Sequence, residues 1–430
     1  MIRSIFIILI FLFLTSCSSS KTTTENNSPT IQNVDVPSKL PMLVVLVNYK
    51  NIGIKYNETE WSERIFGTLP YQLNHYYRQA SASQFTFTPI KESGGIVNDG
   101  VVSVTFEKNH PNLDVNDPEF TTLLYPDFKE ILEKLDTKVD FSEYDTDKNG
   151  ALSNKELIIT FILAGYEDAY EGYHVKNGVW GHQNCMEDDN DIATLDNIEL
   201  LSCAKSATFS IFGETHDKKN SYQASIGIIA HELGHATFNL PDLYNTANSE
   251  KGGIGLFGIM GAGTWTTSDS SQTAGTSPTH FCAWSKIHNG WTTPLEPHNT
   301  QVNLYETTSL NYNIVKIPIN DTSYYLLENR NNSGYDKGLR ELSGTFDGGI
   351  AIWKIDESKM TEQNFLENTV NNDNQNKGVD LVEASDSTID SKGSGGDEDA
   401  LYYMGNKNYL LDLVDNISVR GEEITLDILK

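Results

Sequence analysis

The residues best suited to chemistry lie in segment 226–244, which reads I-G-I-I-A-H-E-L-G-H-A-T-F-N-L-P-D-L-Y and contains one H-E-x-x-H pattern. A helix brings residues four apart onto one face, so the imidazoles of His231 and His235 can bind one metal ion while Glu232 faces a metal-bound water. Zinc lowers the pKa of such a water to about 7, and a nearby carboxylate can take its proton as it attacks a peptide carbonyl. The spacing therefore predicts a zinc peptidase site with Glu232 as general base.

A catalytic zinc site needs a third protein ligand, and the candidate is Asp242, just beyond the helix. Asn239 tolerates the left-handed conformation that ends helices, and Pro241 prevents further helix. We therefore expect the chain to reverse there and bring Asp242 under the two histidines. The alternative is a solvated helix face bearing His, Glu and His. The apolar run at 226–230 argues against it, because such a run is typical of a helix entering a core.

A glycine-rich segment follows at 252–265, G-G-I-G-L-F-G-I-M-G-A-G-T-W, with a methionine in its middle. The succession of H-E-L-G-H, L-P-D-L-Y and G-I-M-G-x-G-x-W resembles the immune inhibitor A-like secreted metallopeptidases, which share the metzincin Met-turn beneath the zinc. By position, the resemblance implies these roles: zinc ligands His231, His235 and Asp242, base Glu232, and Met-turn residue Met260.

The resemblance covers most of the chain, with one departure near the metal ligands. The family usually has a glycine in the turn that ends the helix and one residue fewer before the aspartate. Here Asn239 stands in that turn, and the segment 236–239 is longer. Further similar segments are 76–85, 179–182, 278–286, 290–291, 326–330 and 348–356. In the last of these the family often has a histidine where Lys354 stands, and we assign no catalytic role there.

Residues 145–156, D-T-D-K-N-G-A-L-S-N-K-E, match the EF-hand calcium loop at every specified position. The predicted oxygen ligands are the side chains of Asp145, Asp147, Asn149, Ser153 (directly or through water) and Glu156, and the carbonyl of Ala151. The next run, 157–165, is rich in β-branched residues and predicts a strand rather than a second EF-hand helix, which argues against a calcium sensor. The resembled family has a similar loop before such a strand, which favours structural calcium over an acidic turn without an ion.

The N-terminal segment predicts export and a lipid anchor. The apolar run at 5–14 is too short for an ordinary membrane span and is typical of a signal peptide, here 1–16. Its ending, L-T-S-C, resembles a bacterial lipobox, after which a lipidated Cys17 would become the mature N-terminus. A plain secretory signal is the alternative. Residues 17–40, rich in Ser, Thr and Asn, predict a flexible tether.

Charge and cysteine content narrow the function further. With 31 basic and 59 acidic residues the net charge is −28, which disfavours nucleic acid as a partner. Besides Cys17 there are three cysteines. Cys185 and Cys203 lie in a loop-rich stretch and could pair in an oxidising compartment, which would leave Cys282 buried on its helix. Whether they pair stays open. None has the C-x-x-C spacing that favours zinc ligation.

Hydrophobic patterning predicts a mixture of helices and strands. Strands are expected at 41–48, 85–88, 101–106, 157–165, 322–328, 349–355, 378–383 and 423–428, and helices at 61–83, 125–135 and 280–290 besides the H-E-x-x-H helix. The acidic loop 386–399 is a candidate for a second calcium site, although such loops are usually only solvated. His182, His280 and His288 have no predicted role, because a lone histidine is more often packed or solvated than ligating.

Together these patterns predict a zinc-dependent endopeptidase of α+β, zincin or metzincin-like fold, with a twisted sheet and an active-site helix. The catalytic domain is expected at 41–300, and a β-rich C-terminal region at 301–430 is expected to pack on it. Expected substrates are extracellular or envelope proteins, and the expected location is the bacterial cell envelope, with the protein attached to a membrane by its lipid. The rival is a non-catalytic zincin-fold surface lipoprotein used for binding. Glu232 argues against it, because a binding protein has no use for a base beside the metal.

Overall fold

The computed structural model describes residues 35–247, 252–342, 346–385, 389–390, 395–397, 399–405 and 413–430. The predicted signal peptide, Cys17 and most of the tether lie outside these residues, as does most of the acidic loop 386–399. Within the described ranges, no helix has both the length and the apolar composition needed to cross a membrane.

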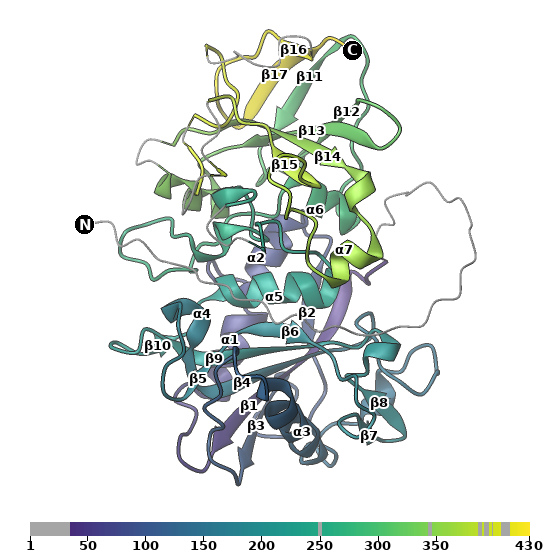
Figure 1. Ribbon diagram of the computed structural model, residues 1–430, viewed down its shortest axis with the longest axis vertical. Coiled ribbons are helices and arrows are strands. Elements are labelled where there is room, and N and C mark those ends of the chain that lie inside the picture. Colours follow the sequence, from purple (N-terminus) through teal and green to yellow (C-terminus); the bar gives the residue numbers. More distant parts are fainter. Residues whose placement is uncertain are drawn as a thin grey trace.

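The elements alternate between helices and strands in the first half of the chain and are mostly strands in the second (Figure 1). The strands are β1 (Lys39–Tyr49), β2 (Thr86–Pro89), β3 (Val101–Phe106), β4 (Ile158–Glu167), β5 (Gly178–Val179), β6 (His182–Asn184), β7 (Ala193–Leu195), β8 (Ile198–Leu200), β9 (Phe209–His216), β10 (Tyr222–Gln223), β11 (Thr300–Tyr305), β12 (Val315–Pro318), β13 (Ser323–Arg330), β14 (Gly349–Asp356), β15 (Val379–Leu381), β16 (Val414–Asp415) and β17 (Glu423–Ile428). The α-helices are α1 (Glu58–Phe66), α2 (Leu73–Ala80), α3 (Phe120–Glu133), α4 (Asp168–Glu171), α5 (Ile226–Phe238), α6 (Ala283–His288) and α7 (Glu362–Leu366). Short 3-10 helices are η1 (Phe141–Glu143), η2 (Cys203–Lys205), η3 (Gly255–Phe257), η4 (Ala262–Trp265), η5 (Gly334–Glu341) and η6 (Glu357–Lys359).

The main sheet is built around β1, which pairs in parallel with β2, β3 and β4. β4 in turn pairs in parallel with β9, and β6 and β10 run antiparallel to β9. Alternate residues of β1 face opposite sides: Val44 packs in the core that contains α1, α2 and α5, whereas Val45 packs in the core that contains α3. Because both faces are covered, β1 is apolar along most of its length.

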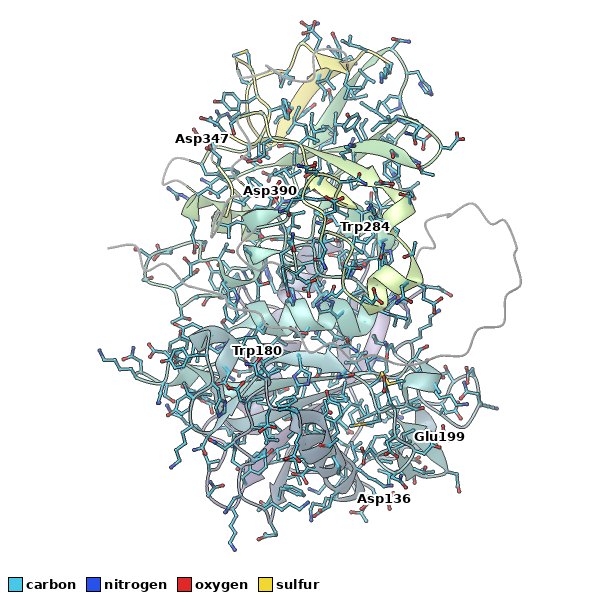
Figure 2. All side chains as sticks on the ribbon, in the orientation of Figure 1. Asp136, Trp180, Glu199, Trp284, Asp347 and Asp390 are labelled. Carbon is cyan, nitrogen blue, oxygen red and sulfur yellow. A yellow bond between two sulfur atoms is a disulfide. The ribbon has the colours of Figure 1, made fainter. Side chains whose placement is uncertain are left out.

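The C-terminal region forms two smaller antiparallel sheets, β12-β13-β14-β15 and β11-β17-β16. In Figure 1, α5 crosses the middle of the molecule between the main sheet and these C-terminal sheets. One continuous core joins them, since Ile229 of α5 belongs to the same buried cluster as Leu326 of β13 and Trp353 of β14. Trp284 of α6 is 1% exposed and lies on the side of α5 that faces the C-terminal sheets (Figure 2).

Four predicted boundaries are wrong. The helix expected at 61–83 is two helices, α1 and α2. The backbone becomes extended at Gly67, and Pro70 lies between the two helices. The helix expected from 125 begins at Phe120 and continues through Pro126. The helix expected at 280–290 is shortened to α6, and the tether expected to reach 40 ends earlier, since β1 begins at Lys39. The strands expected at 101–106 and 423–428 are confirmed as β3 and β17, and the strand after the acidic loop as β4.

Candidate functional site

The histidine pair lies on α5, whose N-terminal residues are apolar and buried. Residues 231 and 235 are one turn apart, so their rings meet on one face, with centroids 4.8 Å apart and planes at 86°. The two Nε2 atoms lie 3.2 Å from each other.

The turn after α5 has the conformation expected from its sequence. The helix extends to Phe238, and Asn239 adopts the left-handed conformation, with φ 51° and ψ 37°. Its N–H donates to the carbonyl of His235 at 2.9 Å, which satisfies a free carbonyl of the helix end. The chain then reverses, so that Asp242 returns beneath the histidines. Its Oδ1 lies 3.0 Å from Nε2 of His231 and 3.3 Å from Nε2 of His235.

Backbone carbonyls fix the orientation of both rings. Nδ1 of His231 lies 2.8 Å from the carbonyl oxygen of Ile259, and Nδ1 of His235 bonds to the carbonyl oxygen of Leu240. A carbonyl only accepts, so each Nδ1 carries a hydrogen, and in the neutral ring the lone pair is on Nε2. Both lone pairs point toward Oδ1 of Asp242, which is the arrangement that metal-binding histidines require.

The three converging atoms fit a zinc ion. Ligand atoms bound tetrahedrally at the usual zinc distances are about 3.3 Å apart, and the three separations here are 3.0, 3.2 and 3.3 Å. Oδ1 of Asp242 is buried without a hydrogen-bond partner. Burial raises the pKa of this carboxyl, but the histidines outweigh burial and hold its pKa below the usual range. An anionic, unpartnered oxygen facing two imidazole lone pairs is suited to a divalent cation.

Glu232 lies beside this cluster and is 8% exposed. Burial raises its pKa to about 8; His231 lowers the pKa, Asp242 raises it, and a hydrogen bond from the backbone N–H of Gln183 lowers it. Gln183 belongs to β6, the short strand that runs antiparallel to β9 next to α5. The carboxyl group therefore lies between the histidine pair and a strand of the main sheet.

Met260 lies against the histidine helix. A Cβ added at Gly234 would meet the Met260 Sδ at 2.8 Å, so a larger residue there would force the Met260 side chain to shift. The carbonyl oxygen of Met260 accepts a hydrogen bond from the N–H of Leu243 at 2.7 Å. The methionine segment thus contacts both the helix and the loop that follows it.

Three residues near this cluster were not predicted. Thr264 donates its hydroxyl to the Ile259 carbonyl at 2.7 Å, the same carbonyl that orients His231. Tyr244 has a pKa raised well above its usual value by loss of hydration and by Asp242 and Glu232. Asn368, from the loop after α7, bonds to both the backbone and the carboxylate of Asp242. No sequence pattern connects residue 368 with residue 242.

The acidic loop at 145–156 is a compact turn that brings three carboxylate groups together. Carboxylate oxygens of Asp145, Asp147 and Glu156 lie within 4.8 Å of one another, and Gly150 adopts a φ of +80° at the turn. Glu156 accepts hydrogen bonds from the N–H of Thr146 at 2.8 Å and of Ser153 at 3.0 Å. Burial raises the pKa of Glu156, but these bonds outweigh it and keep the pKa low. Asn149 and Ala151 occupy the adjoining turn, where the Ala151 N–H donates to Oδ1 of Asn149.

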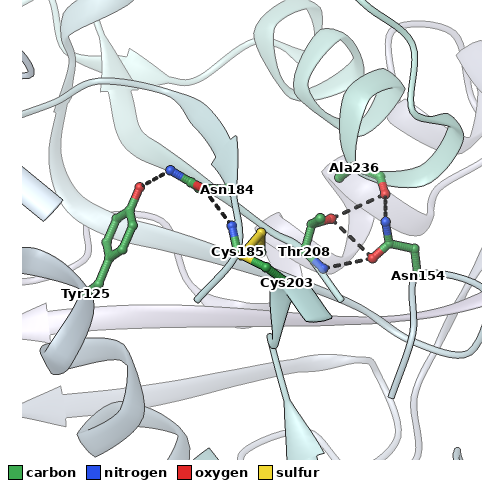
Figure 3. Close-up of a disulfide and its surroundings, with 7 residues drawn as sticks. All are labelled: Tyr125, Asn154, Asn184, Cys185, Cys203, Thr208 and Ala236. Atoms are coloured by element: carbon green, nitrogen blue, oxygen red, sulfur yellow. Dashed lines mark hydrogen bonds between the residues drawn. A yellow bond between two sulfur atoms is a disulfide. The ribbon is translucent and has the colours of Figure 1, made fainter. Parts of the chain in front are cut away.

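This loop also contacts the histidine helix. Nδ2 of Asn154 donates to the carbonyl of Ala236, in the last turn of α5, and Thr208 bonds to both residues (Figure 3). Nearby, Cys185 and Cys203 form a disulfide (Figure 3), whereas Cys282 is a buried free thiol. The pairing considered from sequence is therefore present.

His182, His280 and His288 are packed in the interior, away from the His231, His235 and Asp242 cluster. Nδ1 of His182 bonds to the carbonyl of Trp180, His288 bonds to the carbonyl of Phe238, and His280 is fully buried. Burial lowers the pKa of each. They therefore lie outside the candidate site.

Comparison with known families identifies the catalytic part of the chain. The model of the family described as immune inhibitor A peptidase M6, catalytic domain, matches residues 55–292, more than half of the sequence. The matched range includes α5, Asp242 and Met260. No curated protein matches the chain.

Proposed function

We propose that this chain, which belongs to the immune inhibitor A peptidases of family M6 and is therefore a metallopeptidase, is a zinc-dependent endopeptidase. The zinc ligands would be His231, His235 and Asp242. One observation supports this most: three ligand atoms converge at separations suited to one ion, and the buried carboxylate oxygen among them has no other partner. The site is of the metzincin type in this proposal, with Met260 as the Met-turn residue.

A bound zinc ion would polarise the scissile carbonyl and activate a water as nucleophile. The chain's own residues hold the reactants and move the proton. The Nδ1 hydrogen bonds hold both imidazoles in one orientation, with Nε2 facing the proposed metal position. Glu232 takes a proton from the attacking water and returns it to the leaving amine. An extended substrate would lie along β6, whose Gln183 N–H already faces Glu232.

We further propose that the loop at 145–156 holds a structural Ca²⁺. Its ligands would be Asp145, Asp147, Asn149, the Ala151 carbonyl, Ser153 and Glu156. The ordered hydrogen bonds that aim these carboxylates inward support the assignment. Calcium here would also hold the last turn of α5 through Asn154.

The protein would act outside the cytoplasm, attached to the bacterial cell envelope by a lipid on Cys17, and its substrates would be extracellular or envelope proteins. This part rests on the N-terminal sequence alone. The rival function is binding without catalysis. It is not favoured, because burying a carboxyl group such as Glu232 costs free energy, which a binding site would not require.

The test is digestion of casein by the purified protein, with and without a zinc chelator, together with Glu232→Gln. The amide can hydrogen-bond to a water but cannot accept its proton, so the rate should fall by about 10²–10⁴, while zinc content stays stoichiometric. Glu214→Gln is the matched control, because Glu214 is also buried with a raised pKa but accepts only from Lys55 and Tyr56. An unchanged rate in Glu232→Gln would refute the proposal.

A further inference from the structure

Asp242 is bonded twice by one residue from beyond the matched catalytic range. Nδ2 of Asn368 donates to Oδ2 of Asp242, and the N–H of Asp242 donates to Oδ1 of Asn368 at 2.6 Å. The two residues are 126 positions apart. One amide side chain thus fixes both the backbone and the carboxylate of the third candidate ligand.

Neighbouring asparagines hold the rest of this loop. Nδ2 of Asn371 donates to the carbonyl of Leu243 at 2.8 Å. Oδ1 of Asn372 accepts from the N–H of Thr246 at 2.7 Å and from its hydroxyl at 2.8 Å. The Thr246 hydroxyl also lies 2.8 Å from the carbonyl of Asn368. The segments 368–372 and 242–246 therefore lie next to each other along their length.

Asn368 is itself well anchored. Its N–H donates to the carbonyl of Phe365 at 3.2 Å, and the Phe365 ring packs against Trp284 and His288 of α6, with centroids 6.3 and 5.9 Å away. The Asn368 amide, which contacts Asp242, is thus held in place by a neighbour that packs against α6.

The two carboxylate oxygens of Asp242 have different surroundings. Oδ2 is held by Asn368, whereas Oδ1 is free of hydrogen bonds and faces both imidazoles. We propose that Asn368 is a positioning residue that orients Asp242 for metal binding, so that the zinc site is completed by the C-terminal region. The inference rests on the proposed zinc-peptidase function. Partners of this kind orient metal ligands and typically change metal affinity or activity about 10–100-fold when removed.

The test compares Asn368→Ala and Asn368→Asp with wild type. Asn368→Asp keeps the side-chain size and the Oδ1 acceptor but replaces the donor by a carboxylate facing Oδ2. Asn364→Ala is the matched control: Asn364 is similarly half-buried and bonds to Lys359 and Thr369, yet does not contact Asp242. Zinc affinity is measured by competition with a chromophoric chelator, and the visible spectrum of the Co²⁺-substituted protein reports ligand geometry. Melting of the metal-free proteins checks folding.

Both Asn368 variants should bind zinc about 10–100-fold more weakly than wild type and show an altered Co²⁺ spectrum. The metal-free variants should have the melting temperature of the metal-free wild type, and Asn364→Ala should bind zinc with wild-type affinity. Wild-type affinity and an unchanged spectrum in both variants would overturn the inference. Neither readout needs substrate. A zinc-binding wild type without peptidase activity would therefore overturn the proposed function alone, whereas a wild type that binds no zinc would overturn both.

Discussion

Replacing Arg330 by methionine should destabilise the folded protein by about 3–5 kcal/mol, because the change removes the guanidinium that pairs with the buried carboxylate of Asp336 and leaves Lys286 as the cation beside Glu328. Arg330 is fully buried, and its Nε and Nη2 lie 2.7 and 2.6 Å from the two oxygens of Asp336. Its Nη1 lies 3.3 Å from Oε1 of Glu328. Burial raises the pKa of Asp336, but Arg330 outweighs burial and holds that pKa below the usual range.

The pH dependence follows from the sign of this shift. The folded pKa of Asp336 is depressed, so its contribution to stability is present above the unfolded pKa, about 3.9, and is lost as pH falls toward the folded pKa. In Arg330→Met the depression disappears, and the buried carboxyl groups can take up protons on acidification. The stability difference between wild type and variant should therefore be largest at neutral pH and should narrow toward pH 4.

The assay is urea unfolding followed by tryptophan fluorescence at several pH values. Lys91→Met is the control, since the Lys91–Glu143 pair is exposed to solvent and its loss should leave the midpoint unchanged. Nη1 of Arg330 also donates to the carbonyl of Phe257 at 2.7 Å, three residues before Met260. Zinc binding should therefore weaken along with stability. An Arg330→Met midpoint equal to that of Lys91→Met would refute the reasoning.

Three further predictions concern the metal sites and the N-terminus. Asp242→Ala should lose zinc as well as activity, and near-stoichiometric zinc retained at neutral pH would show that the third ligand lies elsewhere. After chelation and restoration of zinc, titrating calcium back should raise the melting temperature, with a stabilisation of about 2.7 kcal/mol at 100 times the Kd. Glu156→Gln should abolish this response, and calcium-independent melting of the wild type would contradict it. Cys17→Ala should abolish lipid labelling and release the protein from membranes, because stable anchoring needs the lipid's buried CH₂ groups; equal labelling of the variant would exclude the anchor.

Local sequence predicted the parts of the site that lie within one or two turns of each other. The four-residue spacing placed both imidazoles on one face of α5, and Asn239 ended that helix in the left-handed conformation. The EF-hand pattern likewise predicted a loop whose carboxylates point inward. These features depend on backbone geometry over short stretches, which residue type and spacing largely determine.

The failures have physical reasons as well. Apolar spacing alone predicts one helix over 61–83, but the turn residues Gly67 and Pro70 separate α1 from α2. The helix expected at 125–135 begins at Phe120, so that Pro126 lies inside α3. Long-range contacts are beyond such reasoning: nothing about Asn368 distinguishes it from the other asparagines of its segment until the fold brings it to Asp242.

The segment between His235 and Asp242 is longer than the resembled family usually has, which explains why the distant contact between Asn368 and Asp242 matters. Each helical residue turns the exit of a helix by about 100°, and here the left-handed Asn239 redirects the chain directly after Phe238, the last residue of α5. The aspartate then lies in irregular backbone, with neither helix nor strand to hold it. Its position depends instead on the Met260 carbonyl, which binds the next residue, and on the Asn368 amide. Because Asn368 lies beyond residue 292, the matched domain alone does not contain all the contacts that hold Asp242, the candidate third metal ligand.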